Sequence, residues 1–131
     1  MQWLTVGKGI VHAEMFPLLN PYKANPLELF QIWLNLPAMS KMAEPHFTMF
    51  WAQDIPSLVV EDGGGLKTFV SVVAGQIGDE AKPIKPLSPP PDSWAAQPEA
   101  NVAIWTLRLQ PGARYALPPA NAGTRRNLYF F

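Results

Sequence analysis

Apolar residues along the chain mostly follow the pattern of short β-strands. Three segments are rich in β-branched or aromatic residues and are bounded by Pro, Gly or Asn: residues 29–36, 66–74 and 102–109. In residues 66–74, side chains at alternate positions lie on opposite faces of the strand, and one face is expected to be the more buried. The pattern therefore predicts an all-β fold.

Proline and glycine positions set the expected limits of these strands. Fifteen prolines are present, and proline disrupts both helix interiors and central sheet ladders. Residues 82–98 contain six of them and are predicted to form an extended surface loop. The three glycines of residues 63–65 predict a hairpin turn, and the one helix candidate is a short segment at residues 48–54.

Both ends of the chain carry strand-forming residues. Residues 128–131 (LYFF) form an apolar run without a turn or polar tail after it, and Trp3 and Leu4 have the same character. A further strand is expected to begin near Tyr115, after the turn at residues 111–112. Because an open strand needs a partner, we expect the chain to be an internal fragment that is cut at both ends.

Composition narrows the class of protein. The chain has 131 residues, of which 48% are apolar, enough for a globular core. Ten basic and ten acidic residues balance, so binding to nucleic acid or to an anionic membrane surface is not expected. The absence of cysteine excludes disulfides and cysteine metal sites, and no apolar stretch is long enough to span a membrane. We expect a cytoplasmic protein.

The candidate chemistry lies near the start of the chain. His12 and Glu14 are two positions apart, and on an extended strand such side chains point to the same face. Imidazole and carboxylate are ligands of non-haem iron sites. The alternative is that both residues lie on the solvated face of a strand, and the spacing alone leaves this open.

The residues around this pair carry a resemblance to a known family. Residues 2–15 (QWLTVGKGIVHAEM) resemble the second conserved motif of pirins, which belong to the cupin superfamily. Residues 31–37 (QIWLNLP) and 41–45 (KMAEP) look like the pirin segment after that motif. Residues 73–75 and 109–113 (LQPGA) resemble its second half, so the resemblance covers nearly the whole chain.

The resemblance implies two tandem cupin barrels of the jelly-roll type. Residues 1–46 would be the C-terminal part of the N-terminal, metal-binding barrel, and residues 47–53 a linker. Residues 54–131 would be most of the C-terminal barrel. Where a general cupin would place metal-binding histidines in the second barrel, this chain has Pro118 and Ala120, which agrees with the pirin pattern of a second barrel without metal.

Pirins hold one metal, usually iron, with three histidines and one glutamate, and His12 and Glu14 match the last histidine and the glutamate. The first two ligands belong to a His-x-His on an earlier strand, and the chain begins after that point. His46 is the only other histidine, and it lies where the pirin pattern expects no ligand. Impaired iron binding is therefore expected for this chain.

The resemblance also implies a function for the parent protein, namely dioxygenase-like opening of a flavonol such as quercetin, with Glu14 as ligand and catalytic base. A competing hypothesis is an iron-dependent module that binds a protein partner, such as a transcription factor, without turnover. A third is that the segment has no function by itself. Fold does not decide among these hypotheses.

Overall fold

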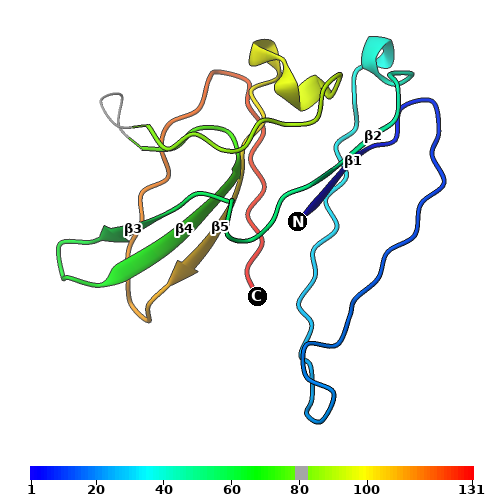
Figure 1. Cartoon of the computed structure of the whole chain (residues 1–131). Helices are drawn as coiled ribbons and strands as arrows, with labels where there is room; N and C mark the ends of the chain where they lie inside the picture. The colour runs from blue at the N-terminus through cyan, green and yellow to red at the C-terminus, as the bar shows by residue number, and fades with distance from the viewer. Residues whose placement is uncertain (79–82) are drawn as a thin grey trace.

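The structure is a computed structural model that describes residues 1–78 and 83–131. Its strands form two antiparallel sheets (Figure 1), one of two strands and one of three. The two-stranded sheet consists of β1 (Gln2–Thr5) and β2 (His46–Met49), and the three-stranded sheet of β3 (Ser57–Glu61), β4 (Lys67–Ala74) and β5 (Ile104–Leu109). Three 3-10 turns complete the described elements: η1 (Ala38–Ser40), η2 (Trp94–Ala96) and η3 (Pro98–Ala100).

The centre of the larger sheet is β4, which pairs with β3 on one side and β5 on the other. Val70 and Val72 are fully buried on one face, while Ser71 on the opposite face is half-buried. The strands predicted at residues 66–74 and 102–109 are confirmed as β4 and β5, and so is the more buried face. A register shift between Val72 and Ala74 lets Val73 and Ala74 both be buried.

The hairpin between β3 and β4 is confirmed at the predicted glycines. The amide of Gly65 donates to the carbonyl oxygen of Asp62 at 2.9 Å, and Gly65 has a φ of +78°. The Asp62 carboxylate oxygen Oδ1 accepts from the amides of Gly64 and Leu66 at 2.9 and 3.0 Å. Asp62 thus closes the turn through its own side chain, as Asp does in many turns.

Two apolar clusters form the core. Trp3 of β1 and Phe50, which directly follows β2, pack with Val73 and Ala74 of β4, so this cluster joins the two sheets. The second cluster lies on the other side of β4 and contains Val70, Val72 and Ile77, with Trp105 and Tyr115 against it. Burial raises the pKa of the Tyr115 hydroxyl above its ordinary value.

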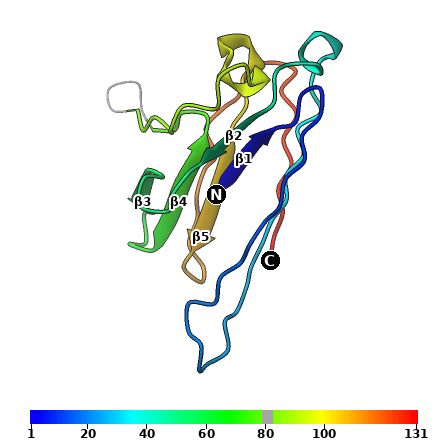
Figure 2. The same cartoon turned by 45° about the vertical axis from the view of Figure 1, so that its right-hand side comes forward.

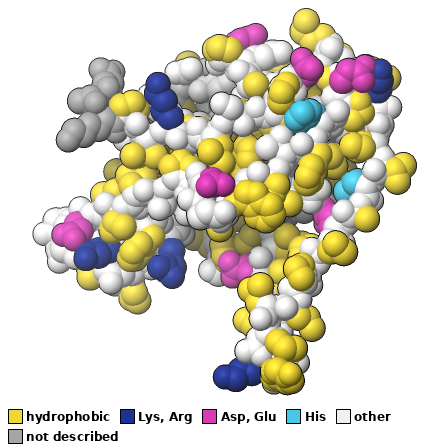
Figure 3. Space-filling model, viewed as in Figure 1, with side chains coloured by type: hydrophobic (Ala, Val, Ile, Leu, Met, Phe, Trp, Pro, Cys, Tyr) yellow, Lys and Arg dark blue, Asp and Glu magenta, His cyan; other side chains and the backbone are white. Residues whose placement is uncertain are grey.

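Residues 10–37, called the arm below, leave the small sheet as a long loop and return to η1. Both ribbon views show the arm projecting beyond the two sheets (Figures 1 and 2). Nearly all of its residues are exposed, and Figure 3 shows apolar side chains along it. The strand predicted at residues 29–36 is therefore wrong, because no described segment pairs with the arm, and strand propensity is realised only with a hydrogen-bonded neighbour.

Two further strand predictions are also wrong, and the predicted helix of one or two turns at residues 48–54 is reduced to one turn. Thr48 lies in β2, and only a single turn follows it, in which the amides of Asp54 and Ile55 donate to the carbonyl of Trp51. No strand begins at Tyr115, and residues 128–131 are exposed and irregular. Phe131 contacts Phe30 of the arm, with ring centroids 4.4 Å apart.

The predicted surface loop at residues 82–98 is partly corrected. Residue 82 lies outside the described residues. Residues 83–97 are irregular apart from a bridge between Ile77 and Ile84 and the turn η2, and η3 begins at Pro98. However, Pro90 and Ser93 are buried, so this segment packs onto the protein. The division into parts at residues 46 and 54 stays a prediction, with β2 extending to Met49 inside the expected linker.

Candidate functional site

His12 and Glu14 lie at the beginning of the arm, just beyond β1. The segment is not part of a sheet, but the two side chains approach each other, with 3.9 Å between Nε2 of His12 and Oε1 of Glu14. Their side chains are 41% and 38% exposed, respectively. Solvent can therefore reach both donor groups.

The base of the arm is held by contacts with residues 43–44. The amide of Lys8 donates to the carbonyl of Ala43 at 3.1 Å, and the Lys8 ammonium pairs with the Glu44 carboxylate. Gly7 has a φ of +53°, and a Cβ added there would lie 1.9 Å from the Ala43 oxygen. Only glycine fits this position. These contacts fix the point from which residues 10–14 extend.

The donor pair is compatible with two adjacent ligands of one metal ion. With metal–ligand bonds of about 2.1 Å, neighbouring ligands of an octahedral ion are about 3 Å apart. The 3.9 Å separation of His12 and Glu14 needs only a small side-chain adjustment to reach this. Imidazole nitrogen and carboxylate oxygen also form the mixed donor set of non-haem iron.

The pair is not a complete centre. Among the residues that the structure describes, no three His, Cys, Asp or Glu side chains are grouped so that they could hold a metal ion. His46 begins β2, where it is exposed and opposite Thr5. The described part of the chain therefore brings together His12 and Glu14 and does not add His46 to them.

A second polar cluster, at the β3–β4 hairpin, was not predicted from the sequence. Oδ2 of Asp62 accepts from the amide of Arg114 at 2.9 Å, so one carboxylate joins the hairpin to the turn after β5. Hydrogen bonds from the backbone amides of Arg114, Leu66 and Gly64 hold the pKa of Asp62 below its ordinary value. The Asp before three glycines was the available signal, but it pointed only to the local turn.

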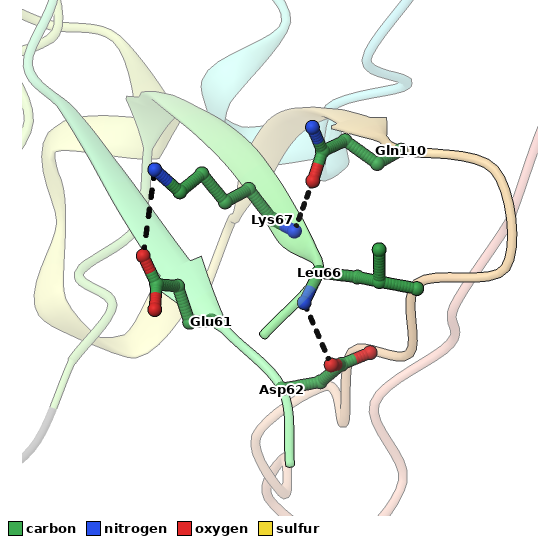
Figure 4. A network of polar contacts seen from close by, with 5 residues as sticks. All are labelled: Glu61, Asp62, Leu66, Lys67 and Gln110. Carbon is green, nitrogen blue, oxygen red and sulfur yellow. Dashed lines mark hydrogen bonds and ion pairs between the residues drawn. The ribbon is translucent and has the colours of Figure 1, made fainter. Parts of the chain in front are cut away.

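Side chains of neighbouring residues continue this cluster (Figure 4). Lys67 pairs with Glu61 across the hairpin at 3.5 Å, and Oε1 of Gln110 accepts from the Lys67 amide at 2.6 Å. These contacts join the neighbouring ends of β3, β4 and β5 and the turns beside them. The cluster has a structural role in fixing the end of this sheet.

Comparisons with known proteins place the chain in a family. It is 36% identical to human pirin over 119 residues, which are 90% of this chain and 33% of pirin. It is 32% identical over its whole length to a protein of Pseudomonas aeruginosa named "Putative quercetin 2,3-dioxygenase", of which it covers 40%. A pirin-like protein of Caulobacter vibrioides is 39% identical over 75 residues, 57% of this chain and 24% of that protein.

The matches cover most of this chain but only part of each relative. The chain spans about a third to two fifths of the length of the two relatives that it matches along most of its own length. No family model matches the chain, and no solved structure matches it. Among the described residues, no helix is long and apolar enough to cross a membrane.

Three observations point to the same family. They are the resemblance of residues 2–15 to pirins, the antiparallel all-β structure and the identity with curated relatives. The predicted all-β fold of the cupin class is confirmed on these grounds. With 30–39% identity to pirins and proteins named as quercetin dioxygenases, the chain belongs to the pirin family.

Proposed function

We propose that His12 and Glu14 are two ligands of an iron site in a pirin-like protein that opens a flavonol such as quercetin with dioxygen. The observation that carries the proposal is the 3.9 Å approach of an imidazole and a carboxylate within the pirin-like motif. The name of the Pseudomonas relative supports the class of substrate.

The two residues have different roles in this proposal. His12 binds the metal through Nε2 and takes no part in proton transfer. Glu14 accepts the proton of the flavonol hydroxyl at a carboxylate oxygen, and its partial exposure leaves this oxygen accessible to a substrate. When bound, iron supplies Lewis-acid and redox chemistry next to that carboxylate.

Two protein ligands hold a metal weakly, because water fills the remaining positions and competes with binding. We therefore expect the 131-residue chain to bind iron with low affinity. Further donors would have to come from water, the substrate or another polypeptide segment. Quercetin turnover by this chain is accordingly expected to be slow.

The test is quercetin consumption under air after anaerobic loading with ferrous iron. Glu14→Gln keeps a metal-binding oxygen but removes the base, whereas His12→Gln weakens the metal site. Both substitutions are expected to lower the rate at least about tenfold. His46→Gln is the matched control and is expected to leave the rate unchanged. An undiminished rate in Glu14→Gln would exclude the proposed base.

A second candidate function is an iron-dependent module that binds a protein partner without turnover. The observation that favours it is the exposed apolar arm, in which Leu19, Tyr22 and Trp33 are 94%, 93% and 86% exposed. Contiguous apolar surface of this kind marks interaction sites in folded proteins. Iron binding without quercetin consumption would favour this function over the dioxygenase.

A further inference from the structure

The larger sheet has an open margin at β3. The strand order β3–β4–β5 gives β3 a hydrogen-bonded neighbour on one side only, and Figure 1 shows it along one margin of the sheet. The opposite margin, β5, has the arm beside it, because Thr106 of β5 and Phe30 and Ile32 of the arm line a common hollow. Among the described residues, no strand pairs with the outer side of β3.

The register with β4 decides which backbone groups of β3 are already paired. At one end of the ladder, the amide of Asp62 donates to the carbonyl of Leu66 at 3.0 Å. At the other end, the amide of Val72 donates to the carbonyl of Pro56 at 2.9 Å. Hydrogen-bonded and non-hydrogen-bonded pairs alternate along an antiparallel ladder, so the even-numbered residues of β3 direct their amides and carbonyls toward β4.

The three odd-numbered residues of β3 are Ser57, Val59 and Glu61. Their N–H and C=O groups point away from β4 and, within the described part of the chain, have no backbone partner. Their side chains lie on the exposed face of the strand, and that of Val59 is 54% exposed. Edge strands are commonly protected from further pairing by lysine, proline or a bulge, and β3 contains none of these.

We propose that the outer edge of β3 pairs with the same edge of a second copy of the chain, in antiparallel direction and about a two-fold axis at Val59. Val59 then lies opposite Val59 of the second copy, and Ser57 lies opposite Glu61. All three outward amides of each copy find a carbonyl, which no other antiparallel register of the two strands achieves. The two three-stranded sheets become one continuous sheet.

The charges of β3 favour antiparallel over parallel pairing. A parallel pair would bring the Glu61 carboxylates of the two copies side by side, and like charges in opposed positions destabilise a sheet. In the antiparallel pair, Glu61 faces the uncharged Ser57, while Lys67 of its own copy pairs with it at 3.5 Å between Nζ and Oε1. The edge is thus complementary to itself in hydrogen bonding and in charge.

The first test is sedimentation equilibrium of the 131-residue chain and of two lysine variants. Val59→Lys puts two ammonium groups opposite each other at the axis and should weaken dimerisation at least about fivefold. Ser57→Lys puts an ammonium opposite Glu61 of the second copy and should strengthen dimerisation about two- to tenfold. Association through the exposed arm would respond to neither substitution, so opposite effects at positions two residues apart identify the β3 edge.

A charge exchange at the axis and amide hydrogen exchange are independent measurements. Val59→Glu alone should dimerise as poorly as Val59→Lys, whereas an equimolar mixture of the two variants should form a mixed dimer, because opposite charges then face each other. Exchange of the Ser57, Val59 and Glu61 amides should slow as the protein concentration rises. The amides of Leu58 and Val60, which are bonded to β4, should exchange slowly at every concentration.

Several results would overturn the proposal. A pairing of this length is smaller than a standard interface, but a monomer at all concentrations up to about 1 mM would exclude it. Equal effects of the two lysine substitutions, or no mixed dimer from the two Val59 variants, would show that the copies associate elsewhere. Circular dichroism shows whether each variant is folded. If Val59→Lys is not, Ser57→Lys decides the question, and dimerisation that it leaves unchanged or weakens contradicts the pairing.

Discussion

Substitution of Gly75 by alanine tests whether the connection after β4 is as crowded as the structure shows. Gly75 has a φ of +71°, and its carbonyl accepts a hydrogen bond from Nε1 of Trp105 at 3.0 Å. A Cβ at this position would lie 2.5 Å from Cβ and 2.7 Å from Cα of Ala103, and 2.8 Å from the carbonyl oxygen of Val102. These contacts are with backbone and a short side chain, which cannot move away without shifting the start of β5.

The expected loss of stability has two parts. A non-glycine residue in the left-handed region loses about 1–2 kcal/mol. Overpacking against a fixed neighbour adds about 1–3 kcal/mol. Gly75→Ala should therefore lower the free energy of unfolding by about 2–5 kcal/mol, a large fraction of the typical stability of a domain.

Gly65→Ala is the matched control for this experiment. Gly65 has a similar φ of +78°, but a Cβ there would meet nothing within 4 Å. It should lose only the conformational part, about 1–2 kcal/mol. The measurement is urea denaturation followed by far-ultraviolet circular dichroism. Equal losses in the two variants would refute the crowding at Ala103, and no loss in Gly75→Ala would refute the positive φ as well.

Other substitutions test the core and the hairpin. Trp3→Ala removes a buried ring whose centroid lies 6.0 Å from that of Phe50, and it should lower the free energy of unfolding by about 3–5 kcal/mol. Trp33→Ala, at an exposed position, should change it by less than about 0.5 kcal/mol in the same denaturation assay. Similar losses in the two variants would contradict the assigned core. Asp62→Asn should lower the melting temperature at pH 7. Because the pKa of Asp62 is lowered in the folded protein, the ionised carboxylate stabilises the fold at pH values above its ordinary pKa of 3.8. The difference in melting temperature between Asp62→Asn and the parent should therefore shrink as the pH falls below 3.8. A difference that stays constant with pH would exclude the carboxylate charge as the cause. The exposed arm should promote association, so sedimentation analysis should show larger species as concentration rises, and a monomer at every concentration would contradict this.

Sequence patterns predicted the larger sheet well because its signals are local and mutually consistent. The β-branched alternation in β4 requires a buried face, and Asp62 with the following glycines fits a tight turn between β3 and β4. Both features depend on residues close together in the chain. The crossing from β4 to β5 was not predicted, since its register depends on a bulge near Val73 and on packing that is distant in sequence.

The segments whose secondary structure was predicted wrongly have a different property, namely that their structure depends on a pairing partner. Residues 29–36 and 128–131 have strong strand propensity, yet in the structure they remain irregular because no described strand lies beside them. At residues 48–54 no helix forms, because Thr48 belongs to β2, which pairs with β1. Propensity is a weak influence when tertiary pairing competes with it.

The candidate site could be predicted from the sequence only in part. His12 and Glu14 are separated by one residue, so their approach follows from local geometry even without a sheet. The Arg114 contact that completes the Asp62 cluster joins residues 52 positions apart, and no pattern in the sequence indicated it. Likewise, the alignment of Ser57, Ser71 and Thr106 across the larger sheet could not be found until the register of β3, β4 and β5 was known.

The most direct test of the metal-binding assignment is an anaerobic titration of the 131-residue chain with ferrous iron, followed residue by residue in NMR spectra. Paramagnetic iron should broaden the signals of His12, Ala13 and Glu14 first, with an affinity that falls at least about tenfold in His12→Gln and in Glu14→Ala. The His46 signal and the affinity of His46→Gln should be unaffected. Broadening centred on His46, or an affinity that survives both substitutions, would contradict the assignment of the pair as iron ligands.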